Sequence, residues 1–220
     1  MLLDLHNHTR YSPDSRVSPA ELVALAQRAG LHGVAITDHN AIRGVAEARD
    51  AARGEFLVIP GIEVSTASGH VLGYGVRNVV PRDLSVHETV ERIVAEGGVP
   101  VAAHPYRFWS GLGDAGVGQA TFPAYETRNG RTLRRGNERA QAGAKTLHLG
   151  ETGGSDSHFL DELATAVTAI DEGSLRLDDV LQRIGEKQTT AQGMDRGAGA
   201  TARYVTKAVS EWIARGMRRI

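Results

Sequence analysis

Two histidines one residue apart, His6 and His8, are the first residues of this chain whose types and spacing indicate chemistry. They follow Leu2-Leu3-Asp4-Leu5, a run with the character of a β-strand. In an extended chain residues i and i+2 point to the same side, so both imidazoles can reach one point just past the strand. Neutral imidazole is the commonest metal ligand in proteins. The pair therefore indicates a metal site, provided that other ligands converge on it.

Further metal-ligating side chains recur just after later apolar runs. They are Asp14, His39, Glu63, His70, His104, Asp156 and His158. Nine nitrogen and oxygen donors exceed what one ion needs, so we expect a multinuclear site with a bridging carboxylate, for which Glu63 is the obvious candidate. The chain has no cysteine, and a donor set of nitrogen and oxygen suits Mn, Zn, Fe or Mg.

These donors must be positioned by strands that alternate with helices along the chain. We expect strands at 2–5, 33–37, 56–64, 69–74, 99–103, 124–127, 146–149 and 164–170, and helices at 18–30, 42–53, 84–97, 137–143 and 177–185. The first helix is signalled by Ser18 as N-cap, Pro19 in the first turn and Glu21 completing a capping box. Residues 108–120 are glycine-rich and are expected to form a loop.

The alternation favours a parallel sheet. Because the donors follow the strands, they would lie at the carboxyl ends, where a β/α barrel places its active site. Roughly seven such units fit into the first ~190 residues, slightly fewer than in the usual eight-unit barrel. Gly153-Gly154 is most simply a tight turn that brings Asp156 to the metal.

Composition excludes several classes of function. The chain has 220 residues, of which 41% are hydrophobic and 23% charged, as in ordinary globular proteins. A formal net charge of −1 gives no general affinity for nucleic acid. No apolar run approaches the ~18 residues needed to span a bilayer. Met1 leads directly into a strand and leaves no room for a signal peptide, so we expect a cytoplasmic protein.

The end of the chain differs from the rest. We expect the barrel to occupy residues 1–192, followed by a glycine-rich linker and a basic amphipathic helix within 193–220. The helix is predicted at Ala202–Ile220, where Tyr204, Ala208, Trp212 and Ile213 form an apolar stripe. We expect this stripe to pack on the barrel; a helix that binds nucleic acid or a membrane is the alternative.

Six short stretches, taken together and in this order, resemble the motifs of one protein family. They are DLHNHTRYSPDS, ITDHN, PGIEVST, GHVLGYG, AHPYR and GGSDSH. The chain thus resembles the PHP family, named for polymerase and histidinol phosphatase, from residue 1 to the end of the predicted barrel. The resemblance implies an α/β fold, a distorted, TIM-like (β/α)7 barrel, and a phosphoesterase centre with two or three divalent metal ions at the C-terminal ends of the strands.

The resemblance also implies how the ligands divide. One ion would take His6, His8, Glu63 and Asp156, a second Glu63, His70 and His104, and a third Asp14, His39 and His158. Glu63, His104 and Asp156 would be central to catalysis. Every position is filled by a competent side chain. Some relatives carry a long insert after the His-Pro motif. That insert is absent here, since only about fifty residues separate His104 from Asp156.

The chemistry of such a centre is phosphate ester hydrolysis. Two metal ions can activate a bridging water and clamp the attacking and leaving oxygens. Arg107, three residues after His104, is predicted to bind the phosphate through paired hydrogen bonds. No Ser/His/Asp or Cys/His arrangement is evident.

Three functions remain at this point. The first is hydrolysis of small phosphomonoesters such as nucleotides. The second is a phosphodiesterase or 5′→3′ exonuclease on short oligonucleotides, in which the basic tail and residues 106–109 hold bases and phosphates. The third is a non-catalytic metal-binding domain, for which degenerate ligand positions would be expected. The expected partner is a small phosphorylated substrate rather than nucleic acid or a membrane.

Overall fold

The computed structural model describes residues 1–171 and 176–195. The predicted C-terminal helix, Ala202–Ile220, lies outside the described residues, and so does most of the predicted linker. Its docking on the barrel and the domain boundary at residue 192 therefore stay predictions. Within the described part, no helix has the length and apolar character needed to cross a membrane.

The strands form one sheet that curls into a nearly closed barrel. They are β1 (Leu2–Asp4), β2 (Gly33–Ile36), β3 (Leu57–Thr66), β4 (Gly69–Tyr74), β5 (Val99–Ala102), β6 (Ala124–Asn129), β7 (Gly150–Gly154), β8 (Ala166–Ala169) and β9 (Thr190–Gly193). Their order is β7-β6-β5-β4-β3-β2-β1-β8-β9. The two ends of the seven-strand ring meet where Asp156 N donates to His6 O (2.7 Å) and His8 N to Ser157 O (2.9 Å). The predicted distorted (β/α)7 barrel is confirmed.

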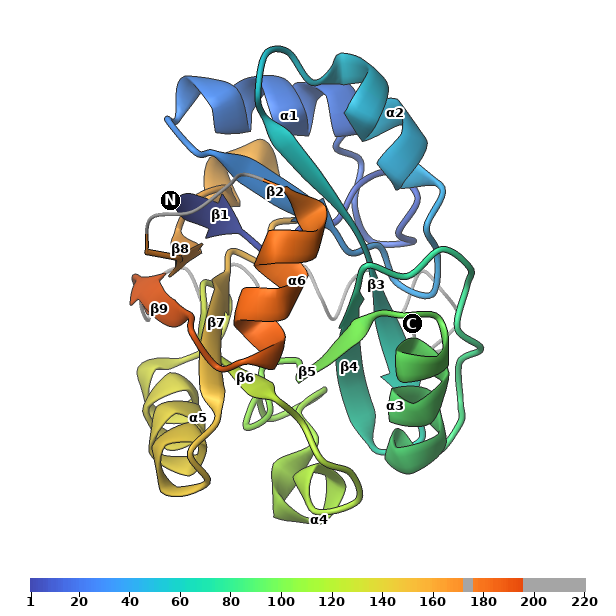
Figure 1. Ribbon diagram of the computed structural model, residues 1–220, viewed down its shortest axis with the longest axis vertical. Coiled ribbons are helices and arrows are strands. Elements are labelled where there is room, and N and C mark those ends of the chain that lie inside the picture. The colour runs from blue at the N-terminus through green and yellow to red at the C-terminus, as the bar shows by residue number, and fades with distance from the viewer. Residues whose placement is uncertain (172–175, 196–220) are drawn as a thin grey trace.

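The helices lie around the ring, and one crosses its end. They are α1 (Pro19–Arg28), α2 (Gly44–Ala51), α3 (Val86–Ala95), α4 (Gly113–Val117), α5 (Arg134–Thr146), α6 (Leu177–Gly185) and the short 3-10 helix η1 (Leu160–Glu162). In Figure 1, α6 crosses the middle of the ring of strands, with the other helices outside it. The predicted capping box of Ser18 and Glu21 begins α1, and Ser85 and Glu88 form a second at the start of α3.

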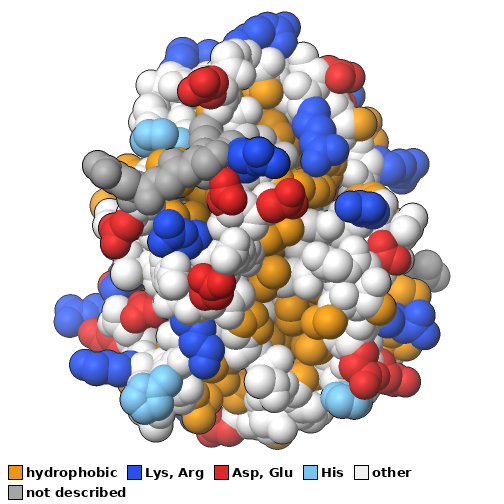
Figure 2. Space-filling view, viewed as in Figure 1, with side chains coloured by type: hydrophobic (Ala, Val, Ile, Leu, Met, Phe, Trp, Pro, Cys, Tyr) orange, Lys and Arg blue, Asp and Glu red, His pale blue; other side chains and the backbone are white. Residues whose placement is uncertain are grey.

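Three hydrophobic clusters follow from this arrangement. One fills the barrel, where Leu3, Leu5 and Tyr74 pack against Val180 and Ile184 of α6. A second lies between the sheet and α3, and a third between the sheet and the helices α1 and α2. Figure 2 shows the face that carries α6, where charged side chains lie around a band of hydrophobic atoms. The helix α6 thus closes the amino-terminal end of the barrel.

The sheet is mixed, and the expectation of a parallel sheet is wrong for part of it. Strand β4 runs antiparallel to both β3 and β5. Only Ala67 and Ser68 separate β3 from β4, and a link this short can join only antiparallel strands because a parallel crossover needs a dozen residues or more. β8 is likewise antiparallel to β1 and β9.

Three local predictions are wrong, and the first two concern element boundaries and a loop. The expected loop at 108–120 contains the short helix α4. The strand expected at 146–149 begins only at Gly150, because α5 continues to Thr146. The sequence of β7 is Gly-Glu-Thr-Gly-Gly, which lacks the β-branched and aromatic side chains that signal a strand.

Gly153 and Gly154 are part of β7 and do not form the expected tight turn. A Cβ at Gly154 would collide with the backbone and Cβ of His6, and one at Gly153 with the backbone of Val167. The glycines therefore allow β7 to approach β1 and β8 closely. This approach closes the barrel and brings Asp156 beside the first two histidines.

Candidate metal centre

All nine predicted ligands lie together at one end of the barrel. Each belongs to a group of donor atoms that lie within 4.8 Å of one another. The groups are His8, Asp14, His39 and His158; His6, His104 and Asp156; His6, His8 and Glu63; and His39, Glu63 and His70. Most of these side chains are buried, and His70 and Asp14 are partly exposed. The sequence prediction that these residues converge agrees with this geometry, while their roles as ligands stay a prediction.

Glu63, on β3, is the centre of the cluster. Its Oε1 lies 2.8 Å from both His70 Nδ1 and His104 Nε2. Its Oε2 faces three other imidazole nitrogens, of His6 (3.3 Å), His8 (3.1 Å) and His39 (3.1 Å). Each carboxylate oxygen thus faces its own set of histidines. This is the arrangement that a carboxylate bridging two ions requires.

His6 and His8 aim at one point, as the strand geometry predicts. Their Nε2 atoms are 3.1 Å apart, and the Oδ1 atom of Asp156 lies 3.3 Å from His8 Nε2 and 3.8 Å from His6 Nε2. Two ring nitrogens and a carboxylate oxygen that converge in a buried space form a donor set suited to a divalent ion.

A further group lies beside His8. The Oδ2 atom of Asp14 is 2.8 Å from His158 Nε2 and 3.7 Å from His39 Nε2. The other oxygen of Asp14 is buried and has no hydrogen-bond partner among the described residues, and the same holds for Nδ1 of His104. Buried polar atoms normally have hydrogen-bond partners. Two potential ligand atoms without such partners are therefore what a cluster that binds metal ions would contain.

The backbone is unusual at two of these residues. His104 has φ of 28° and Asp156 has φ of 53°, in the left-handed region that residues other than glycine seldom adopt. Such a conformation costs on the order of 1–3 kcal/mol and is typical of functional sites. Both residues follow the carboxyl ends of strands, β5 and β7, so the local backbone turns their side chains into the cluster.

The charges in the cluster are strongly coupled. Burial raises the pKa of Glu63 and Asp156, but neighbouring side chains outweigh it and hold both well below their usual range: the imidazoles of His70 and His39 for Glu63, and Arg107 and His6 for Asp156. Burial lowers the pKa of His8, yet hydrogen bonds to Asp156 and Glu63 raise it to about 9. Metal binding at neutral pH would therefore displace a proton from His8.

Residues behind the cluster hold the imidazoles in place. On β6, Glu126 Oε1 lies 2.9 Å from His6 Nδ1, and its Oε2 accepts a hydrogen bond from the backbone N–H of His104 (2.7 Å). Ser12 Oγ lies 3.0 Å from His8 Nδ1 and donates to Asp38 (2.9 Å). Asp4 instead accepts hydrogen bonds from Ser155. Sequence reasoning missed Glu126, although it lies in a predicted strand.

Two arginines reach the same carboxylate. The guanidinium of Arg107 donates to Asp156 Oδ2 and to Asn129 Oδ1. Arg131, which follows β6, lies 3.9 Å from Asp156 Oδ1 and also contacts the ring of His158. Their side chains are only 12% and 8% exposed. Arg107 was predicted from its place after His104; Arg131 follows a glycine in a region without a recognised motif, and sequence reasoning missed it.

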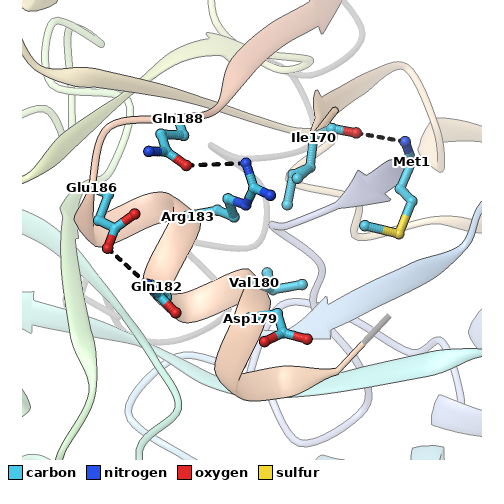
Figure 3. A pocket seen from close by; sticks show the side chains of 8 residues that line it. All are labelled: Met1, Ile170, Asp179, Val180, Gln182, Arg183, Glu186 and Gln188. Atoms are coloured by element: carbon cyan, nitrogen blue, oxygen red, sulfur yellow. Dashed lines mark hydrogen bonds between the residues drawn. The ribbon is translucent and has the colours of Figure 1, made fainter. Parts of the chain in front are cut away.

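A pocket at the other end of the molecule is distinct from this cluster. It has a volume of about 420 Å³ and is lined by Met1, Ile170 and residues of α6 and the segment after it. Figure 3 shows two hydrogen bonds between its polar side chains, from Arg183 to Gln188 and from Gln182 to Glu186. Among its lining residues no group of metal-ligating side chains converges.

We expect the metal-reconstituted protein to bind at least two divalent ions per chain. The reason is that the two oxygens of Glu63 face separate sets of imidazoles, so one ion would leave one set unused. The protein is loaded with Mn²⁺ or Zn²⁺ and dialysed to remove unbound metal, and elemental analysis then measures the number of metal ions per chain. One equivalent or less would contradict a bridging role for Glu63. Glu63→Gln should then lower this number in the same assay.

Comparisons with known proteins place the chain among related sequences. The model of the PHP domain matches residues 4–151, and a model described as PHP-associated matches residues 134–189. An uncharacterized protein from Methanocaldococcus jannaschii is 39% identical over 118 residues, which cover 48% of this chain and 68% of that protein. The domain match spans seven of the nine cluster residues by position, which are His6, His8, Asp14, His39, Glu63, His70 and His104.

Solved structures share the fold at low sequence identity. A two-domain protein from Bacteroides vulgatus, described as containing a predicted PHP-like metal-dependent phosphoesterase, has a TM-score of 0.71 at 19% identity, over 94% of this chain and 69% of that one. PsfC from Pseudomonas syringae has a TM-score of 0.69 at 20% identity, covering 97% and 98%. A lesion-specific endonuclease from Pyrococcus furiosus has 0.63 at 15% identity, covering 89% and 60%.

Proposed function

Because this chain belongs to the PHP domain family, we propose that it is a metal-dependent hydrolase that removes phosphate from small phosphomonoesters, nucleotides among them. One observation supports the choice of a monoester. Two nearly buried guanidinium groups, of Arg107 and Arg131, meet at Asp156 inside the cluster of metal-ligating residues. A terminal phosphate dianion gains more from this concentrated positive charge than a diester monoanion does.

The residues that would hold the ions form three sets around shared donors. They are His6, His8, Glu63 and Asp156; Glu63, His70 and His104; and Asp14, His39 and His158. Divalent ions bound there would supply Lewis acidity, which lowers the pKa of water and neutralises charge on the phosphate oxygens. Their identity is a proposal: Mn, Zn, Fe and Mg all accept nitrogen and oxygen donors.

The contribution of the chain itself is to bind and orient. Asn129 Oδ1 (2.6 Å) and Thr132 Oγ1 (3.2 Å) hold the guanidinium of Arg107 beside the cluster. A guanidinium fixed in this way keeps its positive charge beside the cluster, where it would attract the oxygens of a phosphate. Glu126 and Ser12 fix the rings of His6 and His8 from behind, so the donor atoms need little reorganisation when substrate binds.

A direct comparison of substrates tests this proposal. The purified protein with Mn²⁺ is assayed on p-nitrophenyl phosphate and bis-p-nitrophenyl phosphate, and then on a nucleotide and its short oligomers. We expect a higher kcat/KM for the monoester in each pair. A higher value for the diester or the oligomer would reject the monoesterase. Asp156→Ala, purified in parallel, controls for contaminating phosphatases.

A phosphodiesterase or 5′→3′ exonuclease on short oligonucleotides is the second candidate. It is favoured by the exposed aromatic side chains of Phe108 and Trp109, next to Arg107, because aromatic rings stack on the bases of single strands. The structural relative from Pyrococcus furiosus is described as an endonuclease. The oligomer assay above separates this candidate from the first.

Replacing Arg107 by alanine is expected to raise KM for phosphomonoesters, with little loss of bound metal. The change removes charge-assisted hydrogen bonds to the phosphate but none of the nine donors. Steady-state kinetics and elemental analysis measure the two effects. Arg107→Lys is the matched variant. Its KM should lie between the values of the unmodified chain and of Arg107→Ala, because lysine keeps the positive charge but lacks the planar guanidinium. Unchanged kinetics in Arg107→Ala would make the residue structural.

A further inference from the structure

Two adjacent aromatic side chains stand out from the surface beside the metal centre. Phe108 is 86% exposed and Trp109 is 73% exposed. Their rings form an edge-to-face pair, with centroids 4.7 Å apart and planes at 85°. Large apolar side chains gathered on a surface mark binding sites more often than single ones do.

The loop that carries the pair is anchored at the cluster on both sides. Arg107, just before it, bonds to Asp156. Ser110, just after it, accepts a hydrogen bond through its carbonyl from the backbone N–H of His70 (3.1 Å). Since neighbouring Cα atoms are 3.8 Å apart, each aromatic residue lies within about 8 Å of both anchors, measured along the Cα trace.

The loop is also held in a fixed shape. Gly111 N donates to Arg107 O (3.0 Å) and Gly113 N to Pro105 O (2.9 Å). A Cβ at Gly111 would lie 2.5 Å from Arg107 O and 2.6 Å from Pro105 O, so the turn has no room for a side chain. The aromatic pair is therefore presented by a tight, hydrogen-bonded turn, and a ligand need not order it on binding.

We propose that Phe108 and Trp109 form a stacking platform for the base of a nucleotide whose terminal phosphate enters the metal centre. This inference rests on the proposed phosphoesterase function and names its substrate class. The stretch from Phe108 to Gly113 carries no charged side chain, which suits the neutral π-face of a base rather than a phosphate backbone or a charged peptide. Arg107, one residue before it, lies at the site proposed for the phosphate.

The test compares a nucleotide with the same phosphate lacking its base. The Mn²⁺-loaded full chain is assayed on adenosine 5′-monophosphate and ribose 5-phosphate. Stacking is worth about 1–3 kcal/mol per base, so we expect kcat/KM to be about 5- to 150-fold higher for the nucleotide. Trp109→Ala should lower this ratio toward one, chiefly through KM, and Trp109→Phe should keep most of it. Metal content, measured in both variants, should match that of the unmodified chain.

Tryptophan fluorescence tests the platform without turnover. The chain has two tryptophans, so Trp212→Phe leaves Trp109 as the single reporter. Adenosine 5′-monophosphate should quench this emission, whereas ribose 5-phosphate should not. Equal hydrolysis of both compounds without quenching would overturn the platform and leave the phosphoesterase standing. Quenching without hydrolysis of either compound would support the platform and reject the phosphomonoesterase.

Discussion

Replacing Asp156 or His104 by alanine is expected to reduce phosphate ester hydrolysis to background while the protein remains folded. Asp156 Oδ1 lies 3.3 Å from His8 Nε2, and its other oxygen contacts Arg107. Its loss would remove a donor and leave a buried guanidinium facing imidazoles, with no carboxylate between them. His104 Nε2 lies 2.8 Å from Glu63, so its loss would empty one side of the central carboxylate.

Activity, metal content and thermal unfolding should be measured together in these two variants. His87→Ala is a matched control, because His87 lies on the exposed surface of α3 beside Glu91 and belongs to none of the donor groups. It should keep full activity and full metal content. Turnover by Asp156→Ala or His104→Ala with normal metal content would reject their assignment to the site.

The change of Glu126 to glutamine is expected to weaken metal binding about 10- to 100-fold, as loss of an outer partner of a ligating histidine typically does. Glutamine keeps the size of the side chain and can still bond to His6. It loses the negative charge that increases the basicity of the ring and supports the backbone of His104. The expected effect is on affinity, since Glu126 belongs to none of the donor groups.

Competition with a chromophoric chelator measures this affinity. The matched control is Glu151→Gln on the neighbouring strand β7, whose carboxylate accepts hydrogen bonds from Thr127 and Gln141 instead of contacting a histidine. Glu151→Gln should leave the affinity unchanged. Equal affinities in Glu126→Gln and the unmodified chain would show that the carboxylate serves only to hold β6 in the barrel.

Most of the elements, and the set of residues that converge, were predictable from the sequence because their signals are local. The spacing of His6 and His8 places both rings on one side of an extended chain. The capping box of Ser18 and Glu21 depends on residues three apart. Donors that follow apolar runs meet because strand ends meet at one rim of a barrel. The family motifs, read in order, indicated the same fold.

Other features were decided by contacts between distant segments. β7 was misplaced because its glycines carry no strand signal; they are needed where β7 packs against His6 and Val167. Glu126 and Arg131 reach the cluster from β6 and the turn after it, 120 and 27 residues from the histidines they contact. The left-handed backbone at His104 and Asp156 also depends on its surroundings, because only the packed barrel can offset its cost. The sequence by itself thus determined which metal-ligating side chains exist and which strands they follow, and the tertiary structure decided which residues hold them in place and which arginines reach the cluster.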